Sequence, residues 1–200
     1  ENSGNCAVNA NADVGGLLLT NWTAALTLSD TNTFQVRGSF YQDSGTIACG
    51  TNLFTFYHHS PNFAGGTFTP NASGWVRFQN AGTAAGYTIT GAPPVFENVS
   101  FYTSGGGGTY PWIIPAGSTV TVNRAVIFEG VGYNRLNTGT LVVKGSITNY
   151  NGEQNASANL VLSGSGDQTL HGTAFLPNLI INKPSGRLTL VGTNKTSRNW

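Results

Sequence analysis

The sequence predicts an all-β protein built as a β-solenoid, in which short strands stack coil upon coil. First, apolar and polar residues alternate in many short segments that are bounded by Gly, Pro, Asn or Asp. Second, charged residues make up only 8% of the chain, whereas Thr and Asn number 25 and 22, so the residues of exposed helix faces are scarce. Third, phrases of the sequence recur in a fixed order, as they do in repeat architectures.

The period of two predicts about a dozen strands, because no stretch of ten or more residues keeps a capped helical period. The first four place Leu, Val or Phe at every second position in LTL, FQV, FTF and VRF. The middle four are centred on TIT, VSF, VTV and VIF, and the last four are the apolar segments LVV, LVL, LII and LTL. In chain order they lie within residues 25–30, 34–40, 53–57, 75–80, 87–91, 98–102, 118–123, 125–130, 140–146, 159–164, 178–182 and 187–192.

One nine-residue phrase occurs twice. FQVRGSFYQ begins at Phe34 and LVVKGSITN begins at Leu141, and both place a basic residue before Gly-Ser. A second pair, YTITG from Tyr87 and QTLHG from Gln168, continues each time into an apolar segment and then a Pro-x-Gly turn. The order of elements therefore predicts two degenerate blocks within one domain of residues 1–200. We expect an N-terminal segment at 1–16, a first block at 17–122 with an insertion at 43–86, and a second block at 123–200.

Strands that repeat without helices can stack so that each coil pairs only with its neighbours. Coils of about 20 to 25 residues predict eight or nine coils and a rod on the order of 40 Å long, given a strand spacing of about 4.8 Å. A β-sandwich of two similar halves is the alternative, since alternation with frequent turns is also typical of that fold.

The segment GSGDQTLHGTAFLPNLIINKPSGRLTLVGT, together with the residues that precede it from Leu160, resembles repeats of secreted bacterial β-solenoid proteins. The resemblance rests on a Gly-x-Gly-x-Gln-Thr opening, a Pro-Asn-Leu entry to an apolar strand and an Asn-Lys-x-x-Gly turn. It implies a right-handed parallel β-helix outside the cell, of the adhesin or surface-filament kind. In the first block, Gly86, Tyr87 and Thr88 stand where the repeat has its Gln-Thr opening.

Charge and apolar runs exclude two classes of partner. The net charge is +1 with basic residues scattered singly, so no basic stripe predicts nucleic-acid binding. The longest apolar runs are far too short to cross a bilayer. Since the chain contains no Met, Glu1 is expected to follow a processing event or an excision from something longer, and a removed secretory signal is the simplest interpretation. That predicts an extracellular or cell-surface location.

Two cysteines, Cys6 and Cys49, match the spacing of neither a zinc site nor a redox pair. In an oxidising compartment they predict one disulfide that fastens the N-terminal segment to the insertion. Two free thiols are the alternative.

The charged and histidine side chains do not indicate catalysis. Acidic residues are dispersed along the chain, so we expect no catalytic pair of carboxylates and no cofactor or metal. The adjacent residues His58 and His59 point to opposite faces if they lie in a strand, which argues against joint metal binding. The sequence therefore predicts no enzyme, and a polysaccharide-active enzyme is the third functional hypothesis.

Aromatic and histidine side chains near turns or in the insertion are candidate contacts for a glycan or a protein partner, because flat rings stack on sugar faces. The alternative is that the rings fill the interior of the solenoid. The candidates are Tyr57, His58, His59, Trp75, Tyr110 and Trp112.

The leading functional prediction comes from the two ends of the solenoid. Open strand edges are templates for another chain, and the sequence offers no obvious cap. We therefore expect copies to stack head to tail into an extracellular fibre, with a stalk or glycan-binding module of a larger adhesin as the alternative. The residues expected at the assembly ends are Leu17, Leu18, Leu19, Leu188, Leu190 and Trp200.

Overall fold

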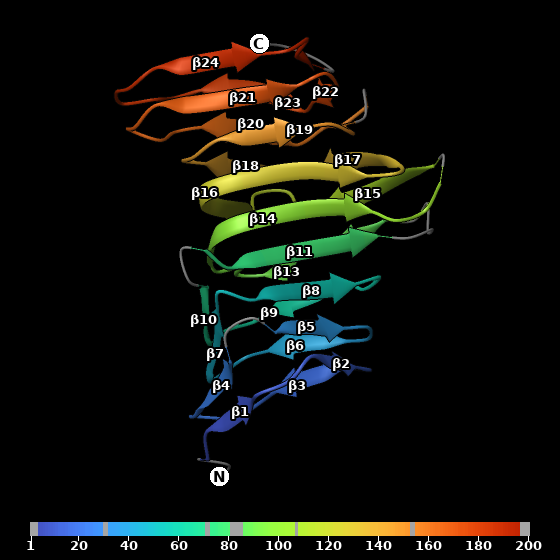
Figure 1. The fold of residues 1–200 in the computed structure, drawn as a ribbon, viewed down its shortest axis with the longest axis vertical. Helices are drawn as coiled ribbons and strands as arrows, with labels where there is room; N and C mark the ends of the chain where they lie inside the picture. The colour runs from blue at the N-terminus through green and yellow to red at the C-terminus, as the bar shows by residue number, and fades with distance from the viewer. Residues whose placement is uncertain are drawn as a thin grey trace.

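The protein is a rod of parallel strands stacked along one axis, as Figure 1 shows. This computed structural model describes residues 4–29, 32–70, 73–80, 86–106, 108–152 and 155–196. Over these residues every paired strand runs parallel to its neighbour, and no helix is present, so none is long and apolar enough to cross a membrane. The prediction of a β-solenoid is confirmed, with about 8 turns, and the β-sandwich alternative is wrong.

Each coil has three sides. The long sheet forms one of them in the N-terminal coils and two of them in the C-terminal coils, because residues 119–122 and 126–128 of one long strand pair with two different following strands. The strands of the long sheet are β2 (Ala12–Val14), β5 (Thr33–Val36), β8 (Leu53–Tyr57), β11 (Trp75–Asn80), β14 (Val95–Thr103), β16 (Thr119–Gly130), β18 (Thr140–Val143), β19 (Ile147–Asn149), β20 (Asn159–Leu162), β21 (Gln168–Gly172), β23 (Asn178–Ile181) and β24 (Leu188–Val191).

Shorter sheets form the sides that the long sheet leaves. One holds β1 (Cys6–Val8), β4 (Ala25–Leu28), β7 (Thr46–Gly50) and β10 (Thr67–Pro70); the next holds β3 (Leu17–Leu19), β6 (Phe40–Gln42), β9 (Pro61–Phe63) and β13 (Thr90–Gly91). The remaining strands are β12 (Tyr87–Thr88), β15 (Thr109–Ile113) and β17 (Tyr133–Asn137), followed by β22 (Phe175–Leu176) and β25 (Lys195–Thr196).

The length of one coil can be read from the strand register. Thr140 pairs with Asn159, 19 residues on, and Asn98 pairs with Ala125, 27 residues on. All twelve expected segments contain strands, and residues 118–123 and 125–130 join into the single strand β16. Strands β7 to β11, within the expected insertion at 43–86, stack in register with their neighbours. The division into blocks at 17–122 and 123–200 stays a prediction.

The core is one apolar column along the axis, because the inward position of each strand is repeated in the next coil. Phenylalanine rings stack within it from coil to coil: Phe56 lies 5.3 Å from Phe78, which lies 5.5 Å from Phe101, which lies 5.3 Å from Phe128, measured between ring centroids. Parallel in-register pairing places identical residues over one another, so the alternation seen in the sequence becomes this ladder.

The twice-written phrase marks a corner of the solenoid both times, but not the same corner. Gly38 follows β5, whose column runs through β8 and β11, whereas Gly145 follows β18, which pairs with residues 119–122 of β16 and lies on a different side of the coil. A Cβ atom at Gly38 would overlap the carbonyl oxygen of Gly15, and one at Gly145 would overlap the carbonyl oxygen of Arg124. The chain therefore requires glycine where one coil passes close to the backbone of the preceding coil.

Candidate functional site

The two cysteines are free thiols, so the predicted disulfide is wrong in this structure. Cys6 pairs with Leu26, and Leu26 pairs with Ile47, so Cys6 and Cys49 lie on the same side of the solenoid but two coils apart. Two strand spacings amount to roughly 9.5 Å. That exceeds the Cα separation of about 7 Å that a disulfide can span.

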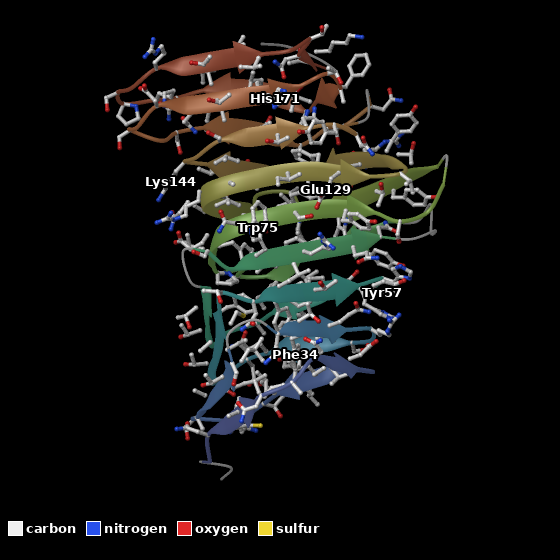
Figure 2. The ribbon with its side chains drawn as sticks, viewed as in Figure 1. Phe34, Tyr57, Trp75, Glu129, Lys144 and His171 are labelled. Carbon is white, nitrogen blue, oxygen red and sulfur yellow. The ribbon has the colours of Figure 1, made fainter. Side chains whose placement is uncertain are left out.

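The predicted aromatic contacts divide into two groups. Tyr110 and Trp112 are both buried, but only Trp112 belongs to the core, where it packs 5.3 Å from Phe78. Tyr110 lies against the glycine-rich loop, and its hydroxyl donates to the carbonyl oxygen of Gly106. Tyr57 and Trp75 are half-buried on the outer face of the long sheet. Figure 2 shows Tyr57 near the end of its strand and Trp75 on the near face of the sheet.

His58 and His59 lie just beyond the end of β8, so the expectation that they alternate within a strand is wrong. His58 has a positive φ of 60° and stacks 3.7 Å from the ring of Tyr57. Above the other ring face, the guanidinium of Arg37 lies 4.5 Å from the Tyr57 centroid and donates a 2.6 Å hydrogen bond to Asp13. Burial, followed by the positive charges of His59 and Arg37, lowers the pKa of His58. A neutral His58 therefore fits this cationic corner.

An outer groove lies on the face that carries Trp75, and it joins four successive coils. Its volume is about 280 Å³, and its lining includes Leu53, Trp75, Arg77, Ser100, Ile127 and Glu129. The register brings these residues together, since Arg77 pairs with Ser100 and Ser100 pairs with Ile127. The groove exists because the small side chain of Ser100 lies between the larger side chains of the two neighbouring strands.

The polar wall of the outer groove is an ion pair. Nη2 of Arg77 donates to Oε1 of Glu129 over 3.3 Å, and the hydroxyl of Ser100 donates to the same oxygen over 2.7 Å. The guanidinium also lies 4.7 Å from the centroid of the Tyr102 ring. Both charged side chains are about 30% exposed. The pair is thus fixed in place yet reachable from solvent.

Sequence reasoning singled out Trp75 but did not select Arg77, Ser100 or Glu129 for this groove. The signal is present once WVRFQN, NVSFY and AVIFEG are written one above another, because Arg77, Ser100 and Ile127 then fall in one column. The spacing of 23 and then 27 residues hides that column from any search at a fixed period.

Four of the carboxylates are paired with arginines one or two coils away. The pairs are Asp13 with Arg37, Glu97 with Arg124, Glu129 with Arg77 and Asp167 with Arg187. In the part of the chain that the structure describes, no group of three or more His, Cys, Asp or Glu side chains could hold a metal ion. Glu1, Asp30 and Glu153 lie outside the described residues.

The last described coil, formed by β23, β24 and β25, leaves apolar side chains uncovered. Ile181 and Leu190 occupy inward positions, because they pair with the buried residues Leu162 and Leu170, yet they are 52% and 47% exposed. Leu188 is half-buried. The predicted contact Trp200 lies outside the described residues.

The first described coil, formed by β1, β2 and β3, also has a neighbouring coil on one side only. Leu17 and Leu19 point inward and pack against the core, whereas Leu18 points outward and is exposed. An open depression with a volume of about 420 Å³ is lined in part by Cys6, Leu18 and Trp22. The exposed inward side chain at this end is Cys6, which pairs with the buried Leu26.

Comparisons with protein-family models, curated proteins and solved structures give no significant match to this chain.

Proposed function

We propose that this protein is an extracellular structural subunit whose copies stack head to tail into a fibre. The observation that carries this proposal is the exposure of the inward-facing apolar residues Ile181 and Leu190 in the last described coil. Inward positions of a solenoid are apolar because a neighbouring coil covers them. A second copy of the chain supplies such a coil.

Two strands of the last described coil lie in the same columns as two strands of the first. β23 lies in the column that begins with β1, since β10 lies beside β14, and the register then runs through β16, β18 and β20. By the same reading, β24 lies in the column of β2. In a stacked pair, Leu179 and Ile181 would lie over Cys6 and Val8, the inward residues of β1.

Stacking by this route has no natural end. All paired strands in the described part of the chain run parallel, so a second copy shifted along the axis meets the first with every strand in the same direction. Such a contact is heterologous, joining two different surfaces, and it repeats with each added copy. The expected product is a filament rather than a closed ring.

Low charge and a surface rich in Thr and Asn support a structural role outside the cell. The resemblance of residues 160–193 to secreted bacterial solenoid repeats supports the adhesin or surface-filament kind. The two free cysteines add no support for an oxidising compartment.

Sedimentation velocity over a wide range of protein concentration tests the proposal. We expect the average sedimentation coefficient to rise continuously with concentration, because each added copy exposes a new end. A single monomeric species at every concentration would overturn it.

The glycan-binding alternative is favoured by one observation, which is the outer groove beside Trp75. Hydrolysis there is not proposed, because glycosidases use two carboxylates, whereas the lining of this groove contains Glu129 as its one carboxylate.

A further inference from the structure

We propose that the outer groove of Trp75, Arg77 and Glu129 binds a neutral sugar ring of a polysaccharide or oligosaccharide. This site lies on the side of the rod, so it does not depend on assembly through the ends. Figure 2 shows Trp75 and Glu129 on the same face of the long sheet, where no other part of the described chain lies over them.

The aromatic wall supplies the stacking surface. Trp75 is half-buried at the start of β11, between Leu53 of the preceding coil and Asn98 of the next. Its ring therefore has support from the sheet and a face available to solvent. The C–H face of a pyranose is apolar, and an indole is the largest flat surface that a side chain offers to it.

The polar wall supplies both kinds of hydrogen-bonding group. Glu129 can accept from sugar hydroxyls, while the guanidinium of Arg77 can donate to them. Nε of Arg77 is buried and has no hydrogen-bond acceptor among the described residues. Nε itself is out of a ligand's reach, so the donors for a sugar hydroxyl are the Nη hydrogens of this 28% exposed side chain that are not used in the bond to Glu129. Two neighbouring hydroxyls match a donor and an acceptor placed side by side.

The charges select the class of sugar. Arg77 and Glu129 compensate one another, so the groove offers no excess positive charge to an acidic sugar. The carboxylate of an acidic sugar would have to compete with Glu129 for the guanidinium. A neutral hexose meets no such repulsion. The volume of about 280 Å³ is small for a ligand site, which fits one ring at a time along a chain that continues over the surface.

Two other side-chain clusters are weaker candidates for a ligand site. The corner of Arg37, Tyr57 and His58 is already closed by its own stacking and its bond to Asp13. The ammonium of Lys183 is occupied by the carbonyl oxygens of Gly164 and Gly166 and by Gln168. Neither arrangement leaves a surface for a ligand.

Saturation-transfer NMR and a tryptophan fluorescence titration test the site, with cellotetraose and mannotetraose as neutral probes and tetragalacturonate as the acidic probe. We expect at least one neutral probe to bind the wild-type protein more tightly than the acidic probe. Trp75→Ala should weaken that binding by about tenfold, the size of one lost aromatic contact. Tyr150→Ala, which removes an exposed aromatic side chain elsewhere on the rod, should leave it unchanged.

Glu129→Gln provides a second test that keeps the shape of the groove. It should lower the affinity for the neutral probe and raise the affinity for tetragalacturonate, because Arg77 then carries an uncompensated charge. The proposal is overturned if no neutral probe binds, if Trp75→Ala binds like the wild type, or if the wild-type protein prefers the acidic probe.

Discussion

Ile181 lies beside Leu162 in the stack of parallel strands, yet Leu162 is 1% exposed and Ile181 is 52% exposed. Both side chains occupy the inward position of their coils. The difference arises because Leu162 has a coil on either side, whereas in the described structure Ile181 has one on one side only. An apolar side chain of this size gains about 1.5 to 3 kcal/mol when it is fully buried. Covering this coil is therefore favourable.

The end coil offers a test with a built-in control. Ile181→Lys should raise the concentration needed for assembly by about a hundredfold or more, because an unpaired charge would be buried between copies. Ile180→Lys changes the neighbouring residue, which is also exposed but points outward. It should assemble like the wild type in the same sedimentation series. Equal effects of the two substitutions would contradict an interface through the inward positions.

Gly145 gives a prediction about folding stability. Alanine there must displace the backbone at Arg124, so Gly145→Ala should lower the free energy of unfolding by about 1 to 3 kcal/mol. Gly166→Ala is the matched control, since a Cβ at Gly166 meets nothing within 4 Å, and its effect should stay within about 0.5 kcal/mol. Denaturant unfolding followed by circular dichroism measures both. Similar losses in the two variants would refute the close-approach argument.

This glycine also shows why the fold could be predicted. The phrase around Gly38 recurs around Gly145 because each glycine marks a corner where the backbone of the preceding coil comes close, and the alternation before it marks a strand, although β5 and β18 lie on different sides of the coil. Local patterns were enough to predict the architecture because each coil repeats the alternation of inward and outward residues and the need for glycine at close corners. They did not reveal β15 or β17, whose sequences TYPWI and YNRLN lack a clear alternation.

The cysteines are expected to differ in reactivity. Burial raises the pKa of the Cys49 thiol, whereas Cys6 is exposed. A thiol reagent should label Cys6 in the folded protein at neutral pH and should label both cysteines after unfolding without reductant. Intact-mass measurement counts the labels. If both cysteines reacted only after reduction, the result would contradict the free thiols and support the disulfide predicted from the sequence.

His58 predicts a pH dependence of stability. Its folded pKa lies below the ordinary value of about 6.5 that it has when unfolded, so between the two values the unfolded chain binds more protons. The free energy of unfolding should therefore fall as the pH is lowered through 6.5 and level off below the folded pKa. His58→Asn, which tolerates the positive φ, should remove this part of the dependence. Parallel pH profiles of the two proteins would contradict the assignment to His58.

The outer groove could not be derived from the sequence in the same way. Arg77 and Glu129 are 52 residues apart, and they meet only because the intervening coils have particular lengths. A shift of one residue in the strand register would move every side chain to the other face of the strand. The predicted disulfide was wrong for a related reason, since the number of coils between Cys6 and Cys49 depends on turns whose lengths vary.

Electron microscopy of the purified protein at high concentration tests the central proposal most directly. About 8 turns at a spacing of roughly 4.8 Å predict unbranched filaments with an axial subunit repeat of about 40 Å. Ile181→Lys should abolish these filaments, and Ile180→Lys should preserve them. Discrete particles of one subunit at every concentration, or filaments that persist in Ile181→Lys, would contradict assembly through the end coils.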